Sequence, residues 1–232
     1  FPDLQLYYAG SGLKSISPSM FFVDLSDEPW VNDLVDASRE MLTVDGKVYG
    51  APTGEMSIGA VFYNKKVFKE LGLDMPKTWK ELMDHCEKIK SAGIVPIYLT
   101  FKNDWTSNII SLLSWYYCEQ SHPGAAKLIN QNKLKFQDIP EFTSSFVKLR
   151  EIIENGYVNE DYFSAILDNA VTALSTGKAA MYIIQSGIIS YVDQSYPDCV
   201  EDIGAFVMPW DDPDVRGTSV WPAIAVYVPQ KG

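Results

Sequence analysis

The feature that most constrains the fold of this chain is the stretch of residues 46–82, in which strand-like sequence gives way to helix-like sequence. Residues 48–62 are rich in β-branched and aromatic side chains, and Pro52, Gly54 and Gly59 interrupt them. This pattern predicts a strand, a break and a second strand. In the rest of the stretch, apolar residues recur at helical spacing. A chain that alternates between these two periods is typical of the α/β class.

The two helices expected in this stretch have their own start and stop signals. Asn64 precedes the first helix, and Gly72 follows its last apolar residue. Thr78 and Glu81 have the spacing of a capping box at the start of the second helix, which Gly93 ends. The apolar face of this second helix is expected to be buried and consists of Trp79, Leu82, Met83, Cys86 and Ile89.

Strands and helices alternate along the rest of the chain as well. Strands are expected at residues 4–9, 94–101, 179–184, 203–208 and 220–228, and the first of them is expected to be buried. Helices are expected at residues 109–115, 140–154 and 167–174. Pro96 predicts an edge position or a bulge for its strand, because proline cannot donate a hydrogen bond to a neighbour. The order of elements predicts an α/β fold with mixed, largely parallel sheets.

Length and composition allow a sizeable core and restrict the partners. The 232 residues, of which 47% are hydrophobic and 21% charged, suffice for one large domain or two smaller ones. The net charge of -11 argues against nucleic acid or an anionic membrane as a partner, because both attract Lys and Arg. No run of about 18 apolar residues occurs, so no membrane-spanning helix is expected. A neutral ligand fits this charge balance.

The chain lacks the sequence patterns of common catalytic, cofactor and metal sites. It contains no GxxxxGK[ST], GxSxG or HExxH motif, so no cofactor is expected. His85 and Cys86 are adjacent, and on a helix they point about 100° apart, which prevents them from pairing as base and nucleophile. The three cysteines match no zinc-site spacing, so no metal is expected, and a disulfide between Cys118 and Cys199 stays open.

Paired carboxylates leave one enzymatic alternative. The pairs are Glu160–Asp161, Glu201–Asp202 and Asp211–Asp212. A glycoside hydrolase needs two carboxylates at a defined separation across a cleft. Adjacent acidic residues are more often parts of solvated turns. A secreted carbohydrate-active enzyme therefore stays an alternative function.

Several segments together resemble one protein family. The segments GKVYGAP, VFYNKKVFKELGL and PKTWKEL occur in that order, and PDLQLYY, AGIVPIYLTFKNDW, ALSTGKAAMYIIQSG and AIAVYV occur at the expected spacing. The set resembles the extracellular solute-binding proteins of ABC importers, in the carbohydrate-binding family 1. The likeness covers nearly the whole chain.

The resemblance implies a two-lobed fold of the periplasmic-binding-protein type, in which strands cross between the lobes. Residues 1–56 would be an incomplete part of the first lobe, residues 57–220 the second lobe, and residues 221–232 the strand that returns to the first. The chain would then be an internal fragment. A hinge made of strands allows the lobes to close about a ligand without unfolding either one.

The implied function is reversible binding of a sugar or oligosaccharide in an interlobe cleft and its delivery to the permease subunits of an ABC transporter. No catalytic residue is implied. The expected location is extracellular, as a periplasmic protein or a cell-surface lipoprotein that meets the membrane only through a lipid anchor outside this chain. A sensory or adhesive module on the same fold is a further alternative, since fold does not fix function.

The candidate ligand-binding residues lie mainly where expected strands end. Ligands of open α/β sheets bind beyond the carboxyl ends of strands. A sugar needs Trp or Tyr against its C–H faces and polar side chains at its hydroxyl rim. Trp105 and Trp221 are expected to be aromatic platforms, with Tyr8 a third, and the alternative for each is a place in the core. The full set is Tyr7, Tyr8, Gly10, Ser11, Glu55, Ser57, Asn103, Asp104, Trp105, Gln185, Ser186, Gly187 and Trp221.

The chain departs from the family pattern at one candidate position. Many relatives carry Gly-Ser-Trp or Gly-Pro-Trp after the strand at residues 179–184, whereas this chain carries Gln185-Ser186-Gly187-Ile188. The sequence thus lacks one tryptophan platform, which allows a smaller sugar or a less hydrophobic solute. In the interrupted stretch the polar ligand contact falls on either Glu55 or Ser57.

Overall fold

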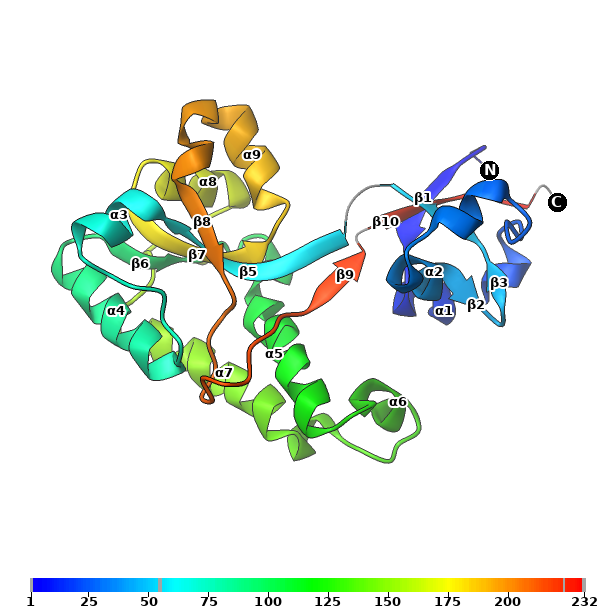
Figure 1. The fold of residues 1–232 in the computed structure, drawn as a ribbon, viewed down its shortest axis with the longest axis horizontal. Coiled ribbons are helices and arrows are strands. Elements are labelled where there is room, and N and C mark those ends of the chain that lie inside the picture. The colour runs from blue at the N-terminus through cyan, green and yellow to red at the C-terminus, as the bar shows by residue number, and fades with distance from the viewer. Residues whose placement is uncertain (1, 54–55, 223, 231–232) are drawn as a thin grey trace. The chain divides into compact units, whose positions relative to one another are not determined.

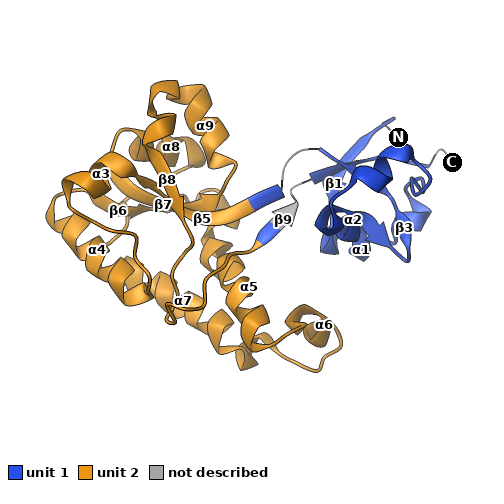
Figure 2. Cartoon of the chain, in the orientation of Figure 1, with its two compact units in different colours: residues 1–57, 220–232 blue, residues 58–219 orange. Residues whose placement is uncertain are grey.

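The computed structural model describes residues 2–53, 56–222 and 224–230. Its chain forms two compact units, residues 1–57 with 220–232 (unit 1) and residues 58–219 (unit 2), which Figure 2 shows in two colours. The α/β class is confirmed, and the sheets are mixed. Two points stay predictions: that the units act as lobes that close on a ligand, and that the lobes have the boundaries expected from the sequence.

Unit 1 is a small sheet with short helices (Figure 1). Its three-stranded antiparallel sheet has the order β1-β10-β4, and a separate hairpin pairs β2 with β3. The elements are β1 (Gln5–Tyr8), α1 (Ser11–Ser15), η1 (Pro18–Met20), η2 (Pro29–Asp33), α2 (Asp36–Leu42), β2 (Thr43–Val44), β3 (Lys47–Val48), β4 (Gly50–Pro52) and β10 (Ile224–Tyr227).

The core of unit 1 lies on one face of this sheet. Tyr227 is fully buried there, and its ring stacks on Phe22 with 4.7 Å between centroids. A side chain at Gly50 would place its Cβ 2.6 Å from the Tyr227 ring, so the close approach of β4 to β10 requires glycine. The cluster consists of Leu13, Phe22, Val31, Leu42, Val48, Tyr49, Ala225 and Tyr227.

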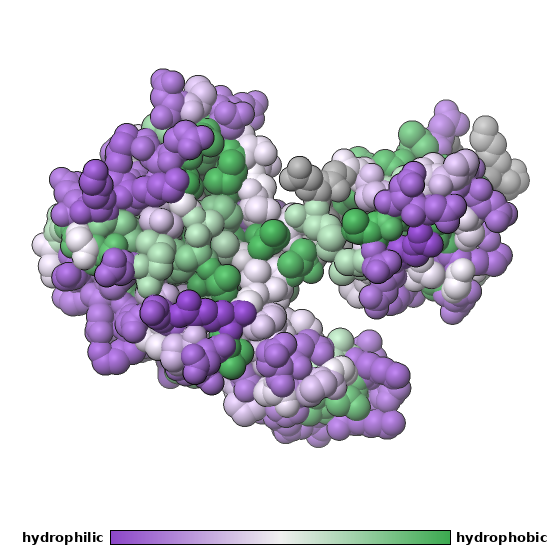
Figure 3. Space-filling view, in the orientation of Figure 1, coloured by the Kyte–Doolittle hydropathy of each residue, from purple (hydrophilic) through white to green (hydrophobic). Residues whose placement is uncertain are grey.

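The opposite face of the same sheet is exposed, which corrects the expectation of a buried strand at residues 4–9. Leu4, Leu6 and Tyr8 are 62%, 59% and 65% exposed, and Figure 3 shows apolar residues at the surface of unit 1. Successive side chains of a strand alternate between faces, and the core cluster covers only the face of Tyr7 and Tyr227. β1 is also an edge strand of the described sheet. An apolar sequence run predicted burial, but only one face of β1 has a partner layer.

We expect this edge to drive self-association of the chain, because an apolar edge strand is a template for pairing. Replacing Leu6 by lysine should lower the oligomeric fraction several-fold in light scattering and sedimentation velocity at equal concentration. Leu112→Lys is the matched control, since Leu112 is 45% exposed in unit 2. A wild-type chain that stays monomeric at all concentrations would contradict the prediction.

Unit 2 contains most of the helices, packed around a larger sheet (Figure 1). The sheet has the order β6-β7-β5-β8, and β9 (Val220–Pro222) also pairs with β5. The elements are β5 (Met56–Asn64), α3 (Lys65–Glu70), α4 (Trp79–Ser91), β6 (Val95–Tyr98), η3 (Asp104–Asn108), α5 (Ile109–Ser121), α6 (Ala125–Asn130), η4 (Phe136–Asp138), α7 (Pro140–Glu154), α8 (Leu167–Ser175), β7 (Ala179–Gln185), α9 (Ile188–Ser195), η5 (Pro197–Asp202) and β8 (Ile203–Phe206).

The strand directions correct the expectation of largely parallel sheets. Only β6 and β7 are parallel among the strand pairs whose register is described, whereas β5 is antiparallel to both β7 and β8. Helices connect β6 to β7, which is the arrangement that strand–helix alternation predicts. β5 instead enters the sheet from unit 1, so its direction is not set by a helical crossover. The expected edge position of Pro96 is confirmed, since β6 ends the sheet order.

The expected features of the first two helices of unit 2 are confirmed in most respects. All five apolar residues expected on the face of α4 are buried. Asn64 caps α3 by accepting hydrogen bonds from the N–H groups of Lys66 and Val67. Thr78 caps α4 by accepting from the Glu81 N–H at 3.2 Å. The reciprocal half of the capping box differs, because the Glu81 carboxylate accepts from Lys77 N–H at 2.6 Å.

The cysteines are free thiols, so the disulfide left open between Cys118 and Cys199 is absent. Burial raises the pKa of the Cys86 thiol strongly and that of Cys118 to about 11. Both thiols are therefore protonated and unreactive near neutral pH. None of the described helices is long and apolar enough to cross a membrane.

Candidate functional site

The strands of unit 2 bring three groups of sequence-predicted residues to one edge of its sheet. β6 and β7 run parallel, with Tyr98 opposite Tyr182, so their carboxyl ends lie at the same edge. β5 runs antiparallel to β7, with Gly59 opposite Gln185, so the start of β5 lies there too. The candidates at this edge are Ser57, Asn103, Asp104, Trp105, Gln185, Ser186 and Gly187. This is the edge at which ligands of α/β sheets bind.

A buried network of hydroxyl groups holds the loop that follows β6. The hydroxyl of Thr100 lies 2.8 Å from that of Tyr182 on β7, and Thr106 Oγ1 donates to the Thr100 carbonyl at 2.8 Å. All three side chains are buried. Burial raises the pKa of Tyr182 to about 12, so its phenol stays protonated and can take part in the network. The loop between the two threonines is therefore fixed to the sheet.

The three candidates in this loop differ in how they are held. Asn103 Oδ1 accepts from the Leu167 N–H at 2.9 Å, which ties the loop to the start of α8. Asp104 Oδ1 accepts from the Trp105 N–H at 2.8 Å. Trp105 is the second residue of η3, and its side chain is 42% exposed, so it is not a core residue. An exposed indole with a carboxylate beside it is the combination that a sugar site needs.

The candidates at the end of β7 lie against the start of β5. The Ser186 N–H donates to the Ile58 carbonyl at 2.8 Å, and the Ile58 N–H donates to Ser186 Oγ at 3.2 Å. α9 begins directly after Gly187, and its first residue, Ile188, is buried in the core of unit 2. Ile188 therefore does not supply the platform for which the family pattern has a tryptophan.

The candidates of unit 1 lie at the end of β1. Tyr8 is exposed, whereas Tyr7 is half-buried and packs edge-on against Tyr227 with 6.5 Å between centroids. Gly10 has a φ of 65° and donates its N–H to the Met41 carbonyl, and Ser11 begins α1. Two other candidates cannot be placed: Glu55 lies outside the described residues, and Trp221 belongs to β9 but its side chain is outside the described part of the chain.

Sequence reasoning missed an aromatic group beside the loop after β6. The Phe101 N–H donates to the Tyr162 carbonyl at 2.8 Å, which places residues 101–103 beside residues 162–167. The rings of Phe101 and Tyr162 are 5.6 Å apart, and those of Tyr162 and Phe163 are 4.3 Å apart. The sequence signal for this group was the adjacent pair Tyr162 and Phe163, which stands in a segment without helical or strand periodicity.

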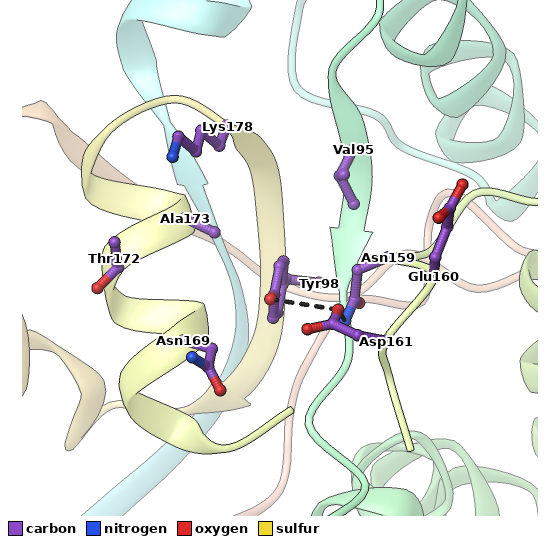
Figure 4. Close-up of a pocket in the computed structure, with 9 residues that line it drawn as sticks. All are labelled: Val95, Tyr98, Asn159, Glu160, Asp161, Asn169, Thr172, Ala173 and Lys178. Carbon is purple, nitrogen blue, oxygen red and sulfur yellow. Dashed lines mark hydrogen bonds between the residues drawn. The ribbon is translucent and has the colours of Figure 1, made fainter. Parts of the chain in front are cut away.

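A cavity of about 500 Å³ lies next to β6 and α8 (Figure 4). Tyr98, Asn159 and Asp161 converge in it, and Asn159 donates to the Asp161 carboxylate at 2.7 Å. Burial, followed by the charge of Asp161, raises the pKa of Tyr98, so its hydroxyl stays protonated and donates to Asp161 at 3.5 Å. The remaining lining residues are Val95, Glu160, Asn169, Thr172, Ala173 and Lys178. Among the residues that the structure describes, none of the sequence-predicted ligand residues lines this cavity.

The three adjacent carboxylate pairs lie in different surroundings. Asp202 pairs with Lys66 at 2.6 Å, and Asp211 pairs with Lys148 at 2.7 Å. Glu160 and Asp161 line the cavity beside β6. Within the described residues, no group of three or more His, Cys, Asp or Glu side chains is arranged to hold a metal ion.

Comparison with known proteins places the chain in a family. The family model described as bacterial extracellular solute-binding protein matches residues 19–231. The chain belongs to this family. A multiple sugar-binding protein of Streptococcus mutans is 27% identical over 212 residues, covering 90% of this chain and 50% of the relative. An sn-glycerol-3-phosphate-binding periplasmic protein of Salmonella typhimurium is 25% identical over 233 residues, covering 92% and 49%.

Solved protein structures share this fold. A chitin oligosaccharide binding protein superimposes with a TM-score of 0.82 at 24% identity, over 98% of this chain and 57% of the other. This member of the bacterial extracellular solute-binding family spans about half the length of the curated relatives that it matches.

Proposed function

We propose that this family member binds a sugar or oligosaccharide reversibly and delivers it to the permease of an ABC importer. The observation that carries the proposal is the position of Asn103, Asp104 and Trp105 in the loop after β6, at the edge of the unit 2 sheet where β7 also ends. The Trp105 indole is exposed on a loop that buried hydrogen bonds already hold in place. Little conformational entropy of this loop is therefore lost when a ligand binds. The sugar-binding relative supports the same ligand class.

Closure of two lobes about the ligand is part of the proposal. The chain passes from unit 1 to unit 2 within β5 and returns to unit 1 at the start of β9, so strands form both connections. Strand connections permit a rotation of compact units with small changes in a few backbone angles. The closed form would be the form that permease subunits recognise, and a lipid anchor outside this chain would keep the protein at the cell surface.

The enzyme alternative has less support than the binding function. Two of the three adjacent carboxylate pairs have a member held in an ion pair with a lysine. The relatives compared above are named as binding proteins. A sensory or adhesive role uses the same binding site, and an assay of transport with the cognate permease would separate that role from import.

The test of the function is a titration of the full-length protein with a ligand panel, followed by Trp105→Ala. The panel contains glucose, galactose, xylose and N-acetylglucosamine, their oligosaccharides and sn-glycerol 3-phosphate. We expect a sugar to bind, and Trp105→Ala to weaken its binding by about 1–3 kcal/mol, the usual cost of removing an aromatic anchor.

The control for this substitution is Phe146→Ala, because Phe146 is 51% exposed on α7 and is not among the site candidates. Its sugar affinity and melting temperature should match those of the wild type. Unchanged affinity in a folded Trp105→Ala variant would remove Trp105 from the site. Tight binding of sn-glycerol 3-phosphate alone would overturn the proposed ligand class.

A further inference from the structure

We infer that Phe163 is a second aromatic contact of the ligand site in unit 2, and that the ligand is an oligosaccharide rather than a monosaccharide. This inference rests on the proposed sugar-binding function. It adds to that function a binding residue and a minimum ligand length. The observations that carry it are the exposure of Phe163, the way its loop is fixed, and the polar segment between it and Trp105.

The Phe163 ring has an exposure that packing does not explain. It is 74% exposed, more than any other large apolar side chain that the structure describes. Burying a phenylalanine side chain stabilises a folded protein, so an exposed ring forgoes this stabilisation. The ring rests on Tyr162 at 4.3 Å and on Phe101 at 6.3 Å between centroids. Neighbours thus support the ring while leaving most of its surface open to a ligand.

The loop that carries Phe163 is fixed on both sides of the ring. The Asp161 carbonyl accepts from the N–H groups of Ser164 and Ala165 at 2.8 and 2.9 Å. The Ala165 side chain is buried, and its carbonyl accepts from the Lys102 N–H at 3.3 Å. On the other side, the Tyr162 carbonyl accepts from the Phe101 N–H. The ring is therefore held in place before any ligand arrives, which lowers the entropic cost of binding.

A polar segment separates the two aromatic contacts along the chain. Phe101 packs against Phe163, residues 102–104 are Lys-Asn-Asp, and Trp105 follows. Apolar rings on both sides of polar groups match a chain of sugar units, in which C–H faces alternate with hydroxyl rims. A monosaccharide offers one ring and occupies one platform. Glu160, Asp161 and Asp104 outnumber Lys102 in this region, so it carries a net negative charge, which disfavours a phosphorylated ligand.

The test measures affinity against ligand length in the wild type and two variants. The probes are glucose, galactose, xylose and N-acetylglucosamine, each as the monosaccharide and as oligomers of two to four units, measured by isothermal titration calorimetry. We expect wild-type affinity to rise with length. Phe163→Ala should weaken binding of the longer oligomers about tenfold, which corresponds to about 1.4 kcal/mol, and should leave the monosaccharide unchanged. Trp105→Ala should weaken binding at every length.

Controls separate failure of this inference from failure of the proposed function. Phe163→Tyr keeps the ring and should restore affinity for the longer oligomers, and Phe146→Ala should match the wild type at every length. Equal affinity for all lengths, or an equal effect of Phe163→Ala at all lengths, would overturn the inference while leaving sugar binding intact. Absence of binding to every sugar by a folded wild-type chain would overturn the proposed function itself.

Discussion

Replacing Asn159 by alanine is expected to lower the free energy of unfolding by about 2–4 kcal/mol, because it leaves buried polar groups without partners. Asn159 is 4% exposed; its Oδ1 accepts from the Leu99 N–H at 2.7 Å, and its Nδ2 donates to the Leu99 carbonyl at 3.1 Å. Nδ2 also donates to the Asp161 carboxylate at 2.7 Å. Alanine would remove all three hydrogen bonds at once. Urea denaturation followed by circular dichroism measures the loss.

Two further variants make this prediction specific to hydrogen bonding. Asn130→Ala changes an exposed asparagine at the end of α6 and should shift stability by no more than about 0.5 kcal/mol. Asn159→Asp keeps the shape of the side chain but replaces its donor by an oxygen that faces the Leu99 carbonyl and Asp161. It should therefore also destabilise the chain. A denaturation midpoint unchanged in Asn159→Ala would show that water replaces these bonds at no cost.

Replacing Lys148 by alanine is expected to lower the free energy of unfolding by about 2–4 kcal/mol, through lost packing and lost cation–π attraction. The Lys148 side chain is 7% exposed although it ends in an ammonium group. Its Nζ lies 4.7 Å from the Trp79 ring centroid and 4.8 Å from that of Trp210. The backbone N–H of Trp79 also donates to the Trp210 carbonyl at 2.8 Å, which fixes the two tryptophans around the lysine.

A series of variants separates the contributions at this site. Lys148→Met keeps the aliphatic stem between the rings and should cost about 1–2 kcal/mol, since it loses the charge but little of the packing. Asp211, the carboxylate partner of Lys148, has a 69% exposed side chain, so Asp211→Asn should cost less than about 1 kcal/mol. Denaturant titration followed by tryptophan fluorescence ranks the three variants by their free energy of unfolding. If Asp211→Asn lowered the free energy of unfolding as much as Lys148→Ala, the stabilisation would come from the ion pair instead.

The sequence by itself determined the features of this protein that depend on neighbouring residues. The caps at Asn64 and Thr78, the buried face of α4 and the edge position of Pro96 follow from spacing and backbone chemistry within a few residues. The α/β class and the family also followed, because several short motifs in register are specific together. These signals are local, so they do not require knowledge of which distant segments meet.

Tertiary structure decided everything that depends on distant partners. β1 has the apolar sequence of a buried strand, but only one of its faces has a packing layer. A lysine in a helix is normally solvated, and Lys148 is buried because Trp79 and Trp210, far away in sequence, close around it. Phe163 joins the candidate site only because backbone hydrogen bonds set its loop beside Phe101. Contacts of this kind are chosen by the packing of the whole chain, and no local period in the sequence encodes them.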